Sequence, residues 1–334
     1  MAGPTIYDVS KRAGVSIATV SRVLNKRETV ALDTRERVLS AIDELGFVPK
    51  IEAVSRARKL LGRIGVLTPS FVDSIVDRMR GITETLTDLP YDTAIYNAHT
   101  PALVEGYLTS LAFNHVVDGL IVIGIDFESS YAQRLVANHL PVVFLGDTGS
   151  PIHEGFDALL LDHGEGAAMA ARYLLEQGHR RFAFVGDAYP QMVSHSLGDS
   201  KLDRFRQTLA EAGVPLPDAN VCLTTLDMEQ TRQQAFRLLD LPKLPTAIFA
   251  GSDTQAIAVM SAARERGLSI PDDLAVLGFD DISISQFVGL TTIHQPLRES
   301  GRFAVETVLA RIEDNTKPLV RWEYPVSLFK RATA

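Results

Sequence analysis

The sequence predicts an α/β protein with an all-α helix-turn-helix headpiece and a two-lobed core containing two parallel sheets. Three observations predict this architecture: two short helix patterns around a glycine in residues 5–25, a linker pattern in 49–63, and alternating strands and helices from residue 64 onward. Such alternation is typical of parallel sheets covered on both faces. The domains are therefore expected at 1–48, 49–63 and 64–334.

The first two helices are defined by their capping residues. Thr5 caps a helix from about Ile6 to Ala13, and Gly14 supplies the positive φ that ends it. Ser16 then caps a second helix over 17–25. The apolar side that packs the two helices together consists of Val9, Ala13, Val15, Val20 and Val23.

The outward face of the second helix carries Ile17, Ala18, Ser21 and Arg22. Small and basic side chains in the first two turns are typical of a helix that enters a DNA major groove. An ordinary helical hairpin with a solvated face is the alternative. It does not explain why the caps, the turn glycine and Arg22 fall in register, so we expect a DNA-binding motif.

A third helix is expected over 31–45, where Val38, Leu39, Ile42 and Leu45 recur at helical spacing. From residue 64, the strands are expected at Ile64–Thr68, Tyr91–Tyr96, Gly119–Ile123, Val142–Leu145, Phe182–Val185, Asn220–Thr224, Ala247–Ala250 and Ala275–Phe279. Helices are expected at Asp73–Asp88, Ala102–Asn114, Glu128–Asn138, Glu165–Gln177, Lys201–Ala212, Met228–Leu239, Thr254–Arg266 and Arg298–Arg311. Two such series predict two similar lobes.

The net charge of −8 over 334 residues divides unevenly along the chain. Residues 1–63 hold 12 Lys and Arg against 7 Asp and Glu, a net charge of +5, and the remainder holds 21 against 34, or −13. A basic module on an acidic body suits nucleic-acid binding. The apolar runs are too short to span a membrane, and the N-terminus lacks a secretion signal pattern. With Cys222 as its single cysteine, the chain has no disulfide or multi-cysteine metal site, and a cytoplasmic protein is expected.

Several motifs together resemble the lactose-repressor/galactose-repressor family of bacterial transcription regulators. They are Tyr7–Val9, Ala13–Ser16, Thr19–Asn25, Thr34–Val38, Gly46–Pro49 and Ile64–Leu67. The resemblance covers nearly the whole chain. It implies a periplasmic-binding-protein-like core whose chain crosses between the lobes near 156–161, 290–296 and 318–326. The lobes would then comprise about 64–156 with 296–320, and about 160–290 with 324–334.

The resemblance also implies which headpiece residues contact DNA. Ile17, Ala18 and Arg22 occupy the positions that read base edges, and an arginine can bind guanine in a bidentate manner. The residues placed for phosphates are Thr5, Tyr7, Ser16, Thr19, Ser21 and Asn25. For Tyr7, packing in the core is an equal alternative.

The linker departs from the family pattern. Ala53 is retained, but Arg56 stands where members carry a leucine that enters the minor groove. Two interpretations stay open: Arg56 and Arg58 enter a narrow minor groove electrostatically, or Ile51 or Val54 supplies the apolar wedge. We therefore expect Ala53 and Arg56 to contact DNA.

Polar and aromatic residues at strand ends predict an effector site, because open α/β sheets bind ligands at that edge. The candidates are Phe71, Asp73, Asp147, Asp162, His163, Lys201, Asp253 and Asp280. By resemblance, Asp280 binds ligand hydroxyls, and Lys201 replaces an arginine. For each acid, a structural turn or helix cap is the alternative. His163 stands where asparagine is usual, and its role stays open.

This set of residues predicts a neutral polyhydroxylated effector, such as a mono- or oligosaccharide. Carboxylates bind vicinal hydroxyls through charge-assisted hydrogen bonds, and Phe71 can stack on a sugar face. A nucleobase or phosphorylated sugar fits less well, because few positive charges are expected to converge there. Together with the family resemblance, this set of residues implies a homodimeric transcription regulator that binds a near-palindromic operator and represses carbohydrate-utilisation genes, repression being the commoner mode of the family. Co-repression and activation stay open as alternatives. No cofactor, metal or membrane partner is expected.

Two other classes of function use the same core. A transport-type sugar-binding protein explains the lobes but leaves residues 1–63 without a role. A carbohydrate-active enzyme could use two carboxylates, but no spacing in the sequence identifies a catalytic pair. The sequence contains no nucleophile elbow, phosphate-binding glycine loop or zinc-spaced histidine pair, so we do not expect an enzyme.

Overall fold

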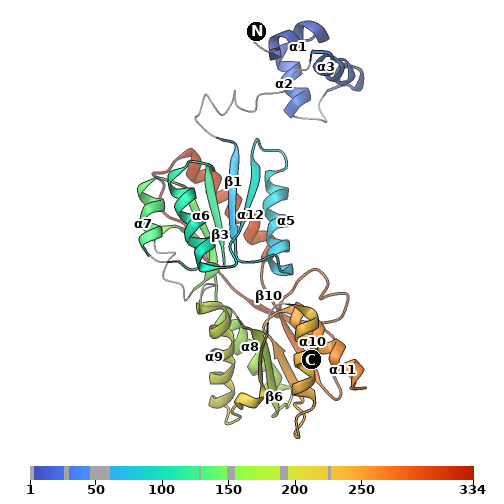
Figure 1. Cartoon of the computed structure of the whole chain (residues 1–334). Coiled ribbons are helices and arrows are strands. Elements are labelled where there is room, and N and C mark those ends of the chain that lie inside the picture. Colours follow the sequence, from blue (N-terminus) through green and yellow to red (C-terminus); the bar gives the residue numbers. More distant parts are fainter. Residues whose placement is uncertain are drawn as a thin grey trace. The chain divides into compact units, whose positions relative to one another are not determined.

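The computed structural model describes residues 4–25, 30–45, 61–127, 129–148, 155–188, 195–224 and 227–334 (Figure 1). Helices α1 (Ile6–Ala13), α2 (Ile17–Asn25) and α3 (Leu32–Leu45) form the headpiece. Their apolar faces share one small core, in which Val9, Val20 and Val38 are fully buried. The predicted helices and the predicted headpiece core are confirmed.

The first lobe contains a six-stranded sheet in the order β11-β5-β4-β3-β1-β2. Its strands are β1 (Arg63–Thr68), β2 (Asp92–Asn97), β3 (Gly119–Ile123), β4 (Val142–Asp147), β5 (Asp157–Leu161) and β11 (Arg321–Tyr324). Its helices are α5 (Asp73–Leu86), α6 (Pro101–Phe113), α7 (Ser129–Ala137) and α12 (Leu297–Glu313). The β11–β5, β5–β4, β4–β3 and β3–β1 pairs are parallel.

The second lobe contains a sheet in the order β12-β10-β9-β8-β6-β7. Its strands are β6 (Phe182–Asp187), β7 (Val221–Thr224), β8 (Ala247–Ala250), β9 (Ala275–Asp280), β10 (Thr291–His294) and β12 (Ser327–Phe329). Its helices are α8 (His163–Glu176), α9 (His195–Glu211), α10 (Met228–Leu239) and α11 (Asp253–Glu265), with a short 3₁₀ helix at Asp218–Asn220. Figure 1 shows the α8–α9 pair and the α10–α11 pair on opposite sides of this sheet. The sheet is parallel except for β12, which runs antiparallel to β10.

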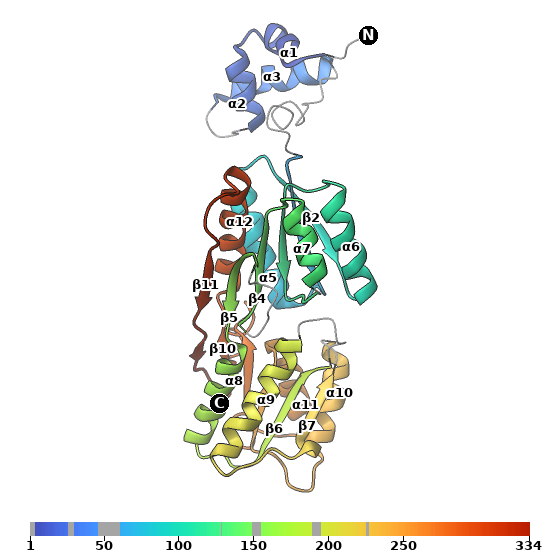
Figure 2. The same cartoon turned by 90° about the vertical axis from the view of Figure 1, so that its left-hand side faces the viewer.

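The chain crosses between the lobes three times, after β5, after β10 and between β11 and β12 (Figure 2). The crossings lie at or directly beside the expected segments, because residues 295–296 and 325–326 fall within 290–296 and 318–326, and Asp162 follows 156–161. Most of each segment belongs to a strand of one of the sheets. β5 and β11 extend the first lobe, and β10 extends the second. The connections themselves are only one or two residues long, such as Asp162 between β5 and α8.

Helices α5 and α12 of the first lobe pack at unusually close range. A Cβ on Gly81 of α5 would lie 2.0 Å from the Arg298 carbonyl oxygen of α12, and one on Gly301 would lie 2.2 Å from the Arg78 carbonyl oxygen. Only glycine permits this approach of two backbones. The contact fixes the position of α5, which carries residues toward the second lobe.

Candidate functional site

Capping residues fix the two ends of α1 and the start of α2. The Thr5 amide donates to the Asp8 carboxylate at 2.8 Å while Thr5 Oγ1 accepts from the Asp8 amide at 3.4 Å, which is a complete capping box. Gly14 has a φ of 66° and ends α1. Ser16 Oγ accepts from the Thr19 amide at 3.1 Å and starts α2. The caps at Thr5 and Ser16 and the role of Gly14 were predicted, whereas the return bond to Asp8 was not. Together they set how the first turns of α2 are presented.

The candidate reading face of α2 is exposed. Ile17, Ala18 and Arg22 are all accessible to solvent, and the Arg22 Nε donates to the Ala18 carbonyl oxygen at 3.3 Å. The side chain of Tyr7 is 67% exposed, which excludes its packing in the headpiece core. Among the expected phosphate contacts, Thr5 and Ser16 are exposed.

Other residues that are expected to contact DNA are less accessible to solvent or lie outside the described residues. Thr19 and Ser21 are half-buried. Asn25 ends α2, but its side chain is not among those described, and Ala53 and Arg56 lie outside the described residues. Their contacts with DNA stay predictions.

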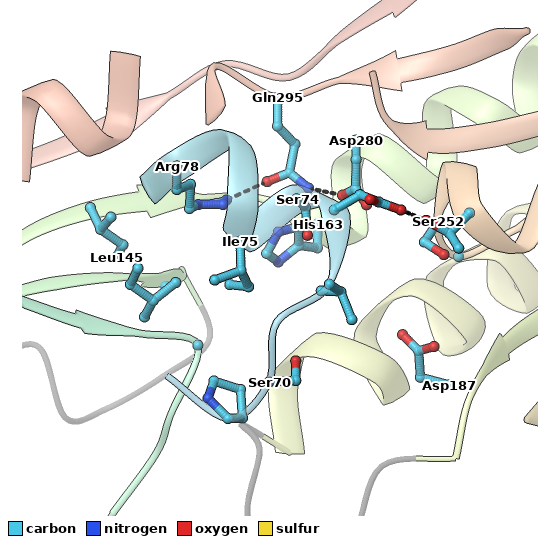
Figure 3. Close-up of a pocket in the computed structure, with 18 of the residues that line it drawn as sticks. Ser70, Ser74, Ile75, Arg78, Leu145, His163, Asp187, Ser252, Asp280 and Gln295 are labelled. Atoms are coloured by element: carbon cyan, nitrogen blue, oxygen red, sulfur yellow. Dashed lines mark hydrogen bonds between the residues drawn. The ribbon is translucent and has the colours of Figure 1, made fainter. Parts of the chain in front are cut away.

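A pocket of about 90 Å³ lies between the two lobes, at the carboxyl ends of strands β1, β3, β4, β6, β8 and β9 (Figure 3). This is the edge at which open α/β sheets bind ligands. The first lobe contributes an apolar wall made of Pro69, Val72, Ile75, Ile123 and Leu145. Of the predicted effector residues, the lining includes Asp73, His163, Lys201 and Asp280.

Asp280 is the most constrained of these four. It has a φ of 112°, a value that favours glycine, and its side chain is 7% exposed. Gln295 Nε2 donates to its carboxylate at 2.6 Å, and Gln295 Oε1 accepts from Arg78 Nη2 at 2.8 Å. Burial raises the pKa of Asp280 to about 6, although the charges of Lys201 and Arg78 oppose the shift. Strained backbone of this kind concentrates at binding sites.

His163 and Lys201 each form a hydrogen bond with another group of the protein. The Nδ1 of His163 lies 2.6 Å from Asp147 Oδ2, and both side chains are buried. Burial lowers the pKa of His163 despite this partner, so its ring is neutral at pH 7. Lys201 Nζ donates to the Gly251 carbonyl oxygen at 2.8 Å and lies 3.9 Å from the centre of the Phe279 ring.

The structure places four predicted effector residues outside the lining. Asp147 lies behind His163, and Asp162 caps α8 by accepting from the Glu165 amide. Phe71 follows β1 but is 51% exposed and does not line the pocket. Asp253 is fully buried, so it cannot touch a ligand in this state.

Asp253 instead connects three segments of the second lobe. Its carboxylate accepts from Ser285 Oγ at 2.5 Å, from Thr292 Oγ1 at 2.5 Å and from the Ile282 amide at 3.0 Å. A Cβ on Gly278 would lie 2.2 Å from Asp253 Oδ1, so β9 needs glycine there. Burial and the nearby Asp280 raise the pKa of Asp253 to about 7.

This pair of acids predicts a pH dependence. Aspartates titrate near 3.9 in unfolded chains, so the folded core holds extra protons on Asp253 and Asp280 between about pH 4 and 7. Their contribution to stability therefore falls as pH rises through that window. His163 has the opposite sign, because its lowered pKa makes folding less favourable below about pH 6.5.

The pH dependence of stability in an Asp253 variant separates the contribution of Asp253 from that of His163. We expect Asp253→Asn to remove part of the loss of stability between pH 4.5 and 7.5, measured as urea midpoints by circular dichroism. Equal pH slopes for the variant and the parent would contradict the assigned role of Asp253.

Several lining residues were not predicted: Ser70, Ser74, Arg78, Asp187, Thr254 and Gln295. Asp187 ends β6 and Gln295 follows β10, so the strand-end rule that found Asp280 could have found both. Ser74 and Arg78 are four residues apart on α5 and share a helix face. Thr254 Oγ1 donates to Asp73 Oδ2 at 2.7 Å, which is a direct hydrogen bond between the lobes.

The described residues contain neither a cluster that could hold a metal ion nor a helix that could span a membrane. Within the described ranges, no group of three or more His, Cys, Asp or Glu side chains could hold a metal ion. No helix in that part of the chain has the length and apolar character needed to cross a bilayer.

Comparison with known proteins identifies the family. Residues 5–50 match the family model of bacterial regulatory proteins, lacI family, and residues 171–334 match that of a periplasmic binding protein-like domain. Catabolite control protein A of Priestia megaterium is 30% identical over 315 residues, which cover 93% of each chain.

Two solved structures extend the likeness to nearly the full length. The lac repressor dimer bound to operator and the anti-inducer ONPF aligns with a TM-score of 0.75 at 26% identity, covering 99% of each chain. The cellobiose complex of the transcriptional regulator CelR aligns with a TM-score of 0.69 at 26% identity, covering 99% of this chain and 100% of the other. The chain therefore belongs to the lacI family of bacterial regulatory proteins: it is a transcriptional regulator with a DNA-binding helix-turn-helix headpiece and an effector-binding core.

Proposed function

We propose that this chain is a cytoplasmic, homodimeric repressor of carbohydrate-utilisation genes, whose operator affinity is set by a small sugar-like effector. The observation that carries the proposal is the pocket between the lobes, which is lined by the carboxylates Asp73, Asp187 and Asp280 together with an apolar wall. Carboxylates bind hydroxyls through charge-assisted hydrogen bonds, and apolar side chains cover the C–H faces of a sugar. The cellobiose complex of the structurally similar CelR supports a carbohydrate effector.

The headpiece supports the DNA-binding part of the proposal. The lac repressor that aligns with this chain is a dimer bound to its operator. Two copies of the exposed α2 face would read two half-sites, because the symmetry of a dimer is copied in its DNA site. Effector binding can shift operator affinity only by its differential affinity for the DNA-competent and incompetent states.

A catalytic role has weaker support. A glycosidase needs two accessible carboxylates, one on each side of the scissile bond. Of the two neighbouring acids Asp253 and Asp280, the first is fully buried and bonded to three donors. The three carboxylates that do line the pocket, Asp73, Asp187 and Asp280, each already accept a hydrogen bond from a neighbouring side chain, which favours a role in ligand binding.

Selection from random duplexes by the purified full chain tests the DNA-binding half of the proposal. We expect enrichment of a near-palindrome, with two similar half-sites. Enrichment of one unpaired half-site would contradict a dimeric reader, and no enrichment of any sequence would contradict specific DNA binding.

A further inference from the structure

Arg78 is a buried cation that lines the pocket, and some of its N–H donors have no acceptor among the described residues. It lies on α5, and its side chain is 7% exposed. A guanidinium has five N–H donors. Within the described part of the chain, Arg78 makes one hydrogen bond, from Nη2 to Gln295, and its buried Nε has no acceptor. Unsatisfied buried charges are costly, so this group is suited to an acceptor that the protein does not itself supply.

Gln295 keeps the charge of Arg78 apart from that of Asp280. The amide accepts from Arg78 and donates to Asp280, so the two charged groups are joined by a neutral group between them (Figure 3). No ion pair of Arg78 occurs among the residues that the structure describes. Burial lowers the pKa of Arg78 to about 10, and the group still carries its charge at pH 7.

Lys201 brings a second cation to the same pocket from the other lobe. Its Nζ uses one of three N–H donors on the Gly251 carbonyl oxygen. The charges of Lys201 and Arg78 both lower the pKa of Asp280 and that of His163, so both cations act on the centre of the pocket. Arg78 is thus a cation of the pocket that the sequence analysis did not identify, beside the expected Lys201.

The charges are also arranged in space. In Figure 3, Arg78 and Leu145 lie on one side of the pocket, and Asp187 and Ser252 lie on the other. The guanidinium of Arg78 thus stands on the opposite side of the pocket from the carboxylate of Asp187, which can accept from hydroxyls. Asp73 of the first lobe already accepts from Thr254, and Lys201 of the second lobe donates to Gly251. A ligand that matches this arrangement has an acidic group at one end and hydroxyls along the rest.

We propose that the effector is a monocarboxylated sugar, an aldonic or uronic acid, whose carboxylate binds the Arg78 guanidinium while its hydroxyls face Asp187 and Asp280. This inference rests on the proposed function, since it specifies the class of its effector. A planar carboxylate fits the donor fork of an arginine. A phosphorylated sugar fits less well, because its second negative charge would face Asp73, Asp187 and Asp280 in the same pocket.

Isothermal titration calorimetry on the full chain tests the inference with matched probes. The panel holds pentose and hexose aldonates and uronates, their neutral parent sugars, and the sugar monophosphates. We expect an acid to bind roughly 10- to 100-fold more tightly than its neutral parent, the range for hydrogen bonds to a charged group. Arg78→Met should abolish this preference while binding of the neutral parent persists.

Two variants keep the result interpretable. Arg78→Lys retains the charge without the fork and should retain part of the preference. Arg302→Met removes an exposed arginine from α12 of the same lobe and should leave the preference unchanged. Arg78 donates to the neutral Gln295 and forms no ion pair among the described residues, so Arg78→Met leaves no salt-bridge partner unpaired and should remain folded by circular dichroism.

The remaining outcomes separate this inference from the proposed function. A neutral sugar that binds as tightly as its acid would overturn the role of Arg78 and leave a sugar-controlled repressor intact. Tighter binding of a monophosphate would overturn the choice of a carboxylate. Failure of every compound to bind would contradict the proposed effector class itself, and the inference with it.

Discussion

Replacing Asp253 by alanine should lower the free energy of unfolding by about 3 kcal/mol. The carboxylate is fully buried and accepts from Ser285, Thr292 and the Ile282 amide. Alanine leaves these three donors without an acceptor in a place that water does not reach. The lost contacts also join the start of α11 to β10 and to the loop after β9, so the effect reaches the elements that hold Asp280.

Urea denaturation followed by circular dichroism measures this change. Asp253→Asn is the matched control, because it retains the shape of the side chain and an acceptor oxygen while removing the charge. We expect it to lose less than half as much stability as Asp253→Ala. A loss below about 1 kcal/mol for the alanine variant would contradict the role of Asp253 as a buried structural acceptor.

Replacing Arg22 by alanine should weaken binding to each specific half-site by about 1–3 kcal/mol, or roughly 5- to 150-fold. Arg22 is exposed on α2, and in the proposed complex it contacts a base edge. Binding to unrelated DNA depends mainly on contacts with phosphates, so we expect it to change much less. Fluorescence anisotropy with the selected duplex and a scrambled duplex measures the two affinities separately.

Arg37→Ala provides the control for charge. It removes the same charge from the same headpiece, on α3, where Arg37 is exposed and pairs with Asp33. We expect this variant to bind the selected duplex nearly as well as the parent. Equal losses for both variants on both duplexes would show that Arg22 contributes charge alone and does not read sequence.

Local signals explain why the headpiece could be predicted in detail. The capping box at Thr5, the positive φ of Gly14 and the cap at Ser16 are all formed by residues within four positions of one another. Such features depend on neighbouring residues and not on the rest of the fold. The helix bounds therefore agree with the prediction within about one residue, a level of agreement that core helices do not all reach.

The missed strands lacked a local signal. β5 is a short apolar run without alternation, which cannot be told from a buried connection by periodicity. β11 is mostly exposed and includes Arg321 and Glu323, and β10 and β12 have only four and three residues. These strands form because they pair with other strands of the sheets, and that pairing depends on distant parts of the chain. The first turns of α9, from His195, were missed as well.

The effector site could be predicted only as an edge of the sheets. The strand-end rule identifies Asp280 correctly as a lining residue, and the family resemblance identifies Lys201, but neither tells which way a side chain points. Ser252 faces the pocket, whereas the next residue, Asp253, is directed into the core. Arg78 was missed because a charged residue within a helix is usually exposed, and its burial depends on the close packing of α5 against α12.

We propose that a ligand in the pocket between the lobes controls DNA binding by the headpiece. The affinity of the full chain for its selected duplex tests this directly, while each compound of the sugar and sugar-acid panel is titrated in and Asp280→Asn is measured in parallel. We expect a compound that binds the core to change the affinity for the duplex at least about fivefold, the lower range of allosteric coupling, and the variant to need a far higher concentration of it. If a compound binds the core while the affinity for the duplex stays constant, the pocket does not control DNA binding.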